Sequence, residues 1–400
     1  MLAWTNDVTN KTYFPAIDGL RLLASLNIVF LHLASSGGFG YAATWKWVMP
    51  IVKAPAFSAS LFFILAGFLF ASKFSDPERR LPVIPFMFGR IAKLYRLHFI
   101  CTVLMFSILI FKFSGVHAVP TSWDALFACV STGLANMVHP WRSLLMHLSL
   151  TWSFAPELGM KLNEPSWALS AFFVCYAITP WCARKLSAVT TPKALWFLFG
   201  AVFVPGIIWG WIFSVADGGV FPVLGDFSNY EIRYRFFHMF PFVRIFEYLF
   251  GMILFRLYKE GQFRIFEKDY WSGIAQVFLL CCLYISLFTL DSSSTSWNFI
   301  GHHSLPVLFF GLLIISLTTS KGWLAILFCI RPVRAVGRAS FYPYLIHLPL
   351  ISIAWMLGNL NSPQGTLFFL IFTYSISTFY QQYKDYSRKK AKARVIPLPA

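Results

Sequence analysis

The sequence predicts an all-α fold, a polytopic membrane bundle of about ten transmembrane helices. Of its 400 residues, 58% are hydrophobic and only 12% are charged, whereas soluble domains carry about 25% charged residues. Apolar runs of about 20 residues, the length of a membrane-crossing helix, recur from end to end. The net charge of +17 does not indicate a nucleic-acid partner, because the basic residues lie between these runs and not along a soluble face.

The apolar runs give the expected helices in order. The first extends over 16–36 and ends in a Ser-Ser-Gly-Gly turn. The other expected spans are 55–72, 97–115, 166–183, 194–215, 239–258, 271–290, 304–320, 339–358 and 365–382. We expect a polar, aromatic loop at 216–238 and a basic connector at 321–338. Prolines and polar residues interrupt the region 122–157, which therefore fits either two short spans or a re-entrant segment.

The distribution of positive charge predicts the orientation. Cytoplasmic loops of membrane proteins carry an excess of lysine and arginine, and most of the 33 such residues here lie in alternate connections. These connections are 73–96, 184–193, 256–268, 321–338 and 384–400. We therefore expect both termini in the cytoplasm, with 1–383 as the transmembrane domain and 384–400 as a basic cytoplasmic tail. The N-terminus lacks the basic, cleavable pattern of a signal peptide, so the first helix is expected to be retained.

The first helix carries Asp18, Arg21 and His32 within an otherwise apolar run. Charge in hydrocarbon is costly, which makes such residues functional candidates. Arg21 and His32 are three turns apart on one face, roughly 16 Å along the axis, and Asp18 lies one turn before Arg21 and can pair with it. A neutral imidazole in an apolar site is a workable general base. The alternative is that His32 is only a packed, hydrogen-bonded side chain.

Arg90, Lys93 and Arg96 repeat every three residues and so share one helical flank. This pattern suits an anionic ligand with several phosphates, such as coenzyme A. The alternative is orientation-setting charge in contact with anionic lipid.

Two later helices also carry polar groups. Arg244 and Glu247 form a spacing that suits an ion pair, with either a cavity role or a purely structural one. His347 lies eight residues into its expected helix, at a depth similar to that of His32. We do not expect a metal site: His302 and His303 are isolated, and the seven cysteines show no ligand spacing. The motifs of serine hydrolases and P-loop nucleotide enzymes are also missing from the sequence.

Six motifs, taken together, resemble the acyltransferase-3 family of bacterial integral membrane acyltransferases, and the likeness covers nearly the whole chain. They are Ile17-Asp-Gly-Leu-Arg21 with Ala24 and His32, Phe62-Phe-Ile-Leu-Ala-Gly-Phe68, Arg90-Ile-Ala-Lys93, Pro165-Ser-Trp-Ala-Leu-Ser with Tyr176 and Pro180, Arg244 with Glu247 and Gly251, and Ser340-Phe-Tyr-Pro-Tyr-Leu-Ile-His347.

Four positions depart from the family pattern. Ala66 stands where a Ser is usual, Lys93 replaces the second Arg of the basic motif, and Arg96 stands where a Pro is common. Five residues after Trp167 the family usually has a Glu, and here that residue is Phe172. The role of that Glu is expected to be absent or shifted to Glu157 or Glu164.

The resemblance implies a stand-alone O-acyltransferase of the bacterial inner membrane. It would move an acyl group, often acetyl, from cytoplasmic acyl-coenzyme A to a hydroxyl of an envelope carbohydrate, such as O-antigen or another lipid-linked or surface glycan. His32 would be the general base, Arg21 would orient it or contact the donor, and Asp18 would hold Arg21. The basic motif would bind the coenzyme A phosphates. The residues expected to line or support the cavity are Trp167, Tyr176, Arg244, Glu247, Tyr342 and His347.

Two other functions fit the same sequence. A transporter or flippase also uses intramembrane charges, as its substrate path, although the two halves of this chain show no evident repeat. A non-catalytic relative of the family would explain the departures at Ala66 and Phe172.

Overall fold

The computed structural model describes residues 13–35, 51, 55–74, 82–116, 120–155, 158–215, 230–291, 299–301, 304–358, 360 and 362–395. These residues form helices and turns without a strand, which confirms the all-α prediction. Six of the described helices are long and apolar enough to cross a membrane, and a seventh span results if a bent pair of helices counts as one. The protein is therefore a multi-pass membrane protein. The count of about ten spans and the cytoplasmic termini stay predictions.

Every expected span coincides with a helix. The helices concerned are α1 (Pro15–Ser35), α3 (Pro55–Lys73), α4 (Val83–Phe113), α7 (Trp167–Ser187), α8 (Pro192–Val215), α10 (Pro241–Lys259), α11 (Asp269–Asp291), α13 (Leu305–Thr318), α16 (Phe341–Met356) and α17 (Pro363–Val395). Proline opens several of these helices, for example α10 and α13. The first turn tolerates proline because its missing N–H has no partner there in any helix.

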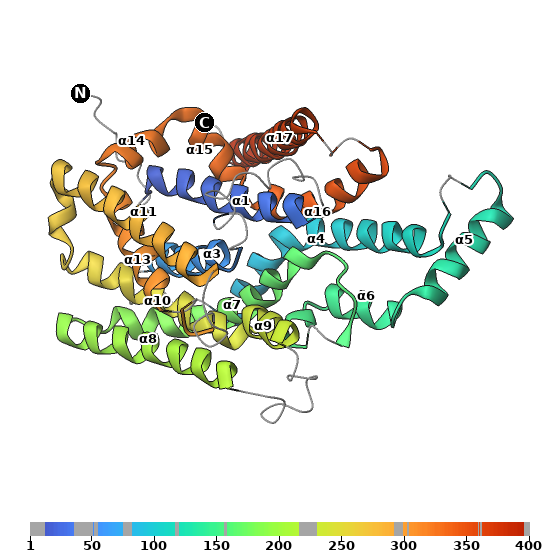
Figure 1. Ribbon diagram of the computed structural model, residues 1–400. Helices are drawn as coiled ribbons and strands as arrows, with labels where there is room; N and C mark the ends of the chain where they lie inside the picture. The colour runs from blue at the N-terminus through green and yellow to red at the C-terminus, as the bar shows by residue number, and fades with distance from the viewer. Residues whose placement is uncertain are drawn as a thin grey trace.

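The centre of the bundle is the crossing of α3 and α10 (Figure 1). A Cβ atom added at Gly67 would overlap the carbonyl oxygen of Tyr248, and one added at Gly251 would overlap that of Ile64. The two glycines thus allow the backbones to touch, as small residues do in membrane bundles. Helix α1 packs beside this crossing and also contacts α16. This arrangement of α1, α3, α10 and α16 positions the candidate site residues.

Four connections contain more helix than the sequence predicted. The prediction of a loop at 216–238 is wrong for residues 230–238, which belong to helix α9 (Tyr230–Met239). The connector 321–338 forms two short helices, α14 (Trp323–Cys329) and α15 (Arg331–Ala339). Helix α4 begins before the basic motif, and α17 continues through the expected tail as far as Val395. Lysine, arginine and glutamine are good helix formers, so charge alone did not mark a helix end.

The ambiguous region 122–157 forms α5 (Trp123–Asn136), α6 (Pro140–Leu148) and the 3₁₀ turn η2 (Trp152–Phe154). Both helices are shorter than the roughly 20 residues that cross a bilayer. Helix α5 folds back against the end of α4, and the two form an arm at one side of the bundle (Figure 1). The N-terminus of α5 is capped by Ser122, whose hydroxyl accepts a hydrogen bond from the Ala125 amide.

Candidate active site

Two histidines from opposite ends of the chain meet inside the bundle. The ring centroids of His32 on α1 and His347 on α16 lie 5.0 Å apart. The Nδ1 atom of His347 donates a hydrogen bond of 2.8 Å to the carbonyl oxygen of Pro343, because a carbonyl can only accept. A neutral His347 therefore carries its lone pair on Nε2, which is buried and has no hydrogen-bond partner among the described residues. This nitrogen is able to accept a proton.

A cavity of about 90 Å³ opens beside His32. Its walls are mostly apolar with a few polar groups, the composition typical of a small-molecule site. The residues around it are Ile28, Leu31, His32, Ala59, Glu164, Pro165, Trp167, His238, Met239 and Tyr344. They come from α1, α3, α9, α16, the segment before α7 and the first residue of α7, so only the folded bundle creates this space.

Arg244 fixes the orientation of His238 in this cavity. Its Nε donates to the His238 carbonyl oxygen at 2.7 Å, and its Nη2 donates to His238 Nδ1 at 2.5 Å. Because a guanidinium only donates, Nδ1 must be the unprotonated nitrogen of a neutral ring, which leaves the proton on Nε2. The ring also packs edge-on against Trp167, with centroids 4.9 Å apart. His238 is therefore held as a hydrogen-bond donor through Nε2.

The same arginine forms a fully buried ion pair. Arg244 Nη1 lies 2.9 Å from both carboxylate oxygens of Glu247, and Ser60 on α3 donates to that carboxylate at 2.6 Å. Arg244 also stacks on Trp167, with its guanidinium carbon 5.4 Å from the ring centroid. Arg244 and Glu247 are 0% and 2% exposed, so the ion pair is closed to solvent. This pair joins α3, α9 and α10 and supports the wall of the cavity.

The segment before α7 brings Glu164 to the cavity. Asn163 donates to the Leu345 carbonyl oxygen at 3.1 Å, and the Tyr344 hydroxyl donates to the Pro165 carbonyl oxygen at 2.5 Å. These bonds attach the segment to α16. Lys161 pairs with Glu164 at 2.8 Å and lies within electrostatic range of His32. A cation and a carboxylate therefore stand beside the histidine.

Asp18 and Arg21 lie away from the cavity, at the other end of α1. Asp18 is buried, accepts hydrogen bonds from the Tyr13 hydroxyl and from Arg21, and is 3.4 Å from the latter. Arg334 of α15 donates to the same Tyr13 hydroxyl. Arg21 is partly exposed and lies, with Arg90, within electrostatic range of the Tyr176 hydroxyl. Arg21 thus shares a neighbour, Tyr176, with Arg90 of the basic motif, and Asp18 has structural partners.

The basic motif of α4 faces the end of α17. A groove of about 690 Å³ lies between α4, α16 and α17. Arg96, Tyr342, Tyr380 and Lys384 stand around it, and Lys384 Nζ lies 5.7 Å and 5.8 Å from the centroids of the two tyrosine rings. The residues that complete its lining are Leu97, Ile100, Ile346, Ile376, Ser377, Tyr383 and Ser387.

Positive charge concentrates at the mouth of this groove. Lys93 lies within electrostatic range of Arg90, Lys384 and Arg388. Partial burial and the neighbouring Arg388 lower the pKa of Lys384, and Asp385 opposes that change. An anion bound at this place would relieve the repulsion between the cations. Lys384 and Arg388 belong to the expected tail, so the sequence did not connect them with the motif on α4.

The position of the missing family carboxylate is part of the aromatic core. Phe172 is buried and stacks on Phe63, with ring centroids 4.4 Å apart, and on Tyr176 at 5.7 Å. A charged side chain would have to displace these rings. Of the two alternatives to Phe172, Glu164 lines the cavity, and Glu157 lies outside the described residues.

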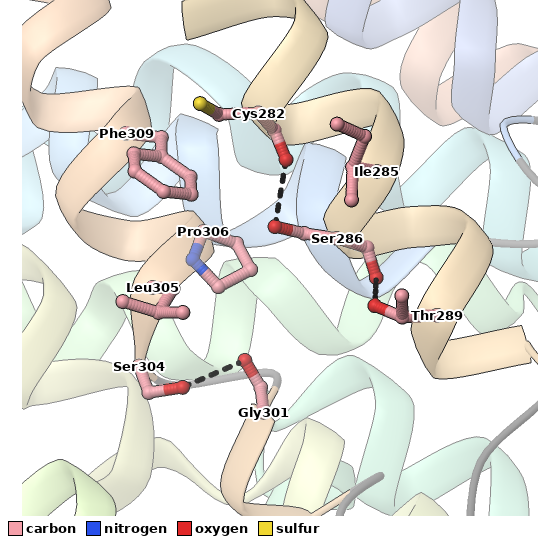
Figure 2. A pocket seen from close by; sticks show the side chains of 9 residues that line it. All are labelled: Cys282, Ile285, Ser286, Thr289, Gly301, Ser304, Leu305, Pro306 and Phe309. Carbon is pink, nitrogen blue, oxygen red and sulfur yellow. Dashed lines mark hydrogen bonds between the residues drawn. The ribbon is translucent and has the colours of Figure 1, made fainter.

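A second crevice of about 220 Å³ lies between α11 and α13, apart from the histidines (Figure 2). Its hydroxyls bond to backbone carbonyl oxygens: Ser286 donates to Cys282 at 2.7 Å, Thr289 to Ser286 at 3.0 Å, and Ser304 to Gly301 at 3.2 Å. The rest of the lining is apolar. The lining also includes the free thiol of Cys282, and the neighbouring His302 and His303 lie outside the described residues.

Sequence reasoning missed His238, Ser60, Lys161 and Lys384. His238 lies in the segment expected to be a loop, and its only signal was its position six residues before Arg244. Ser60 resembles any small residue of an apolar helix. The contacts of these residues join segments distant in the chain, which no local pattern reveals.

The fold and this site define a multi-pass membrane protein with a buried histidine cavity and a basic groove near one end of the bundle. The chain belongs to the acyltransferase-3 family, described as an acyltransferase domain, whose model matches residues 14–380. This confirms the resemblance seen in the motifs. Acyltransferase MdmB of Streptomyces mycarofaciens is 28% identical over 188 residues, which cover 46% of this chain and 43% of that relative. No solved structure matches the chain.

Proposed function

We propose that the protein is an inner-membrane O-acyltransferase that moves an acyl group, most simply acetyl, from acyl-coenzyme A to a hydroxyl of an envelope carbohydrate. Family membership supports acyl transfer. The observation that carries the proposal is the close pair of His32 and His347, with an unpartnered buried Nε2 on His347. An imidazole held in this way is suited to take the proton of an acceptor hydroxyl.

The chemistry follows from the groups around the cavity. One imidazole of the pair removes the hydroxyl proton, and the oxygen attacks the thioester carbonyl carbon. The carbon–sulfur bond then breaks, and the proton passes to the coenzyme A thiolate as it leaves. The Nε2–H of His238 is a donor for the carbonyl oxygen while negative charge develops on it. Lys161 adds positive potential, and Glu164 neutralises it in the resting state.

The donor is proposed to bind with its nucleotide at the groove between α4 and α17. Arg96, Lys384 and Arg388 supply cations for phosphates, and Tyr342 and Tyr380 supply aromatic faces for the adenine. Arg21 and Arg90 both lie within electrostatic range of the Tyr176 hydroxyl, and Arg21 is on α1, the helix that carries His32. The roughly 16 Å along α1 from Arg21 to His32 is a distance that an extended pantetheine arm can bridge.

The direct test is transfer of label from radiolabelled acetyl-coenzyme A to glycan in membrane vesicles. We expect His32→Ala to abolish labelling and His139→Asn to retain it. His139 is an exposed histidine with a left-handed backbone, φ 48°, which asparagine tolerates. Unchanged labelling in His32→Ala would contradict the proposed mechanism. Binding of acetyl-coenzyme A without any transfer would identify a non-catalytic relative, and movement of unmodified glycan would identify a transporter.

The donor groove has its own test. Lys384→Gln combined with Arg388→Gln should raise the KM for acetyl-coenzyme A and leave kcat nearly unchanged, because these groups bind phosphate away from the reacting atoms. Lys390→Gln, an exposed lysine on the same helix, is the matched control. An unchanged KM in the double variant would place the donor elsewhere.

A further inference from the structure

The short helix α14 presents an apolar stripe to its surroundings. Trp323, Ile326, Leu327 and Ile330 are 74%, 62%, 51% and 47% exposed. Their spacing places them on one face of the helix and its C-cap. Seven residues are too few to cross a membrane. The stripe therefore suits a helix that lies in the surface of a bilayer with its apolar face turned to the lipid.

The next helix, α15, adds a ridge of arginines. Arg331, Arg334 and Arg338 fall within about 60° of one another around the helix axis, and Arg331 and Arg338 are exposed. Arg334 is tied to Tyr13, with its guanidinium carbon 5.4 Å from the ring centroid. Helix α15 is bent by 66° from the apolar helix α16 that follows it, which fits a surface position beside a spanning helix.

Both short helices rest on the beginning of α1. A Cβ atom added at Gly337 of α15 would overlap the backbone carbonyl of Asp18, and one added at Gly19 would overlap the ring of Phe328 in α14. Figure 1 shows α14 and α15 alongside α1. There is no space in either contact for independent movement. A force on α14 or α15 is therefore transmitted to the helix that carries Arg21 and His32.

We propose that α14 and α15 form a membrane-surface anchor that binds anionic phospholipid and sets the position of α1. The apolar stripe enters the lipid, and Arg331 and Arg338 bind the phosphates of the headgroups. The ligand is a lipid and not a free nucleotide, because the arginines adjoin an exposed apolar stripe. Anionic lipid then stabilises the seated position of α1 and raises activity, a consequence that rests on the proposed acyl transfer.

The test uses the full chain in nanodiscs of phosphatidylcholine, with or without phosphatidylglycerol. Native mass spectrometry counts the phosphatidylglycerol that is retained, and this readout does not depend on catalysis. The variant is Arg331→Gln with Arg338→Gln. The control is Arg184→Gln with Lys185→Gln, an exposed basic pair at the end of α7. Each basic residue near an anionic surface contributes about 1 kcal/mol, so we expect roughly fivefold to thirtyfold weaker retention in the variant only.

Acyl transfer gives the second readout. Phosphatidylglycerol should stimulate the native protein and the control but not the α15 variant, and soluble glycerol phosphate should not replace it. Gly337→Ala, which pushes α15 away from Asp18, should keep lipid retention and lose the stimulation. Equal retention in the two double variants would overturn the anchor. Weaker retention without any acyl transfer in the native protein would overturn the proposed function and leave the anchor standing.

Discussion

His32 and His347 lie near opposite ends of the chain, yet their imidazole rings come within 5.0 Å of each other between α1 and α16. The hydrogen bond from His347 Nδ1 to Pro343 determines which nitrogen of that ring is basic. A neutral His347 therefore keeps its lone pair on Nε2.

The first prediction concerns this pair. His32→Ala and His347→Ala should each lower kcat by about 10²- to 10⁴-fold, the usual contribution of a positioned general base. If the rings act as one unit, the double variant should be no worse than the poorer single variant. Steady-state transfer in proteoliposomes measures both. Multiplicative losses in the double variant would show that the two residues act separately.

The second prediction concerns the buried ion pair. Arg244→Leu leaves Glu247 buried without its cation and should lower the free energy of unfolding by about 3–5 kcal/mol. The control is Asp269→Asn, which removes a pair with Lys321 in which the aspartate side chain is 78% exposed. That change should cost less than about 1 kcal/mol. Unfolding in detergent, followed by circular dichroism, compares the two variants. Equal decreases in the free energy of unfolding would contradict a structural role of the buried pair.

The third prediction concerns the crossing of α3 and α10. Gly251→Ala should separate the helices, because the new methyl group meets the Ile64 backbone, and overpacking of this kind costs about 1–3 kcal/mol or more. Gly200→Ala is the matched control, since nothing lies within 4 Å of its Cβ position. We expect a lower Tm for Gly251→Ala and an unchanged or slightly higher Tm for Gly200→Ala. A tolerated Gly251→Ala would contradict the contact.

The fourth prediction concerns orientation. With both termini in the cytoplasm, a green fluorescent protein fused after Ala400 should fluoresce, and alkaline phosphatase fused there should be inactive. Phosphatase inserted between α11 and α13, at residues 292–298, should be active, because that connection falls on the opposite side. The reverse pattern would contradict the orientation taken from the basic connections.

The sequence predicted the positions of the spanning helices because bilayer crossing requires about 20 apolar residues, a property of each segment alone. It also identified the family, through short motifs that are local in the chain. It was wrong where a partly buried helix replaced an expected loop, as in α9, because the length and charge of that segment resemble those of a connection. Phe172 shows the same limit: the sequence reveals the departure, and only its stacking on Phe63 shows that the position belongs to the core.

By itself, the sequence determined the membrane class and the family, and it singled out the candidate site residues His32, Arg21 and the basic motif. Tertiary structure alone decided which of these residues meet. It joined His32 with His347 and His238, left Asp18 away from these histidines, and brought Lys384 to Arg96. The physical reason is that a span is defined by the water and lipid around one segment, whereas a site depends on close packing between segments hundreds of residues apart.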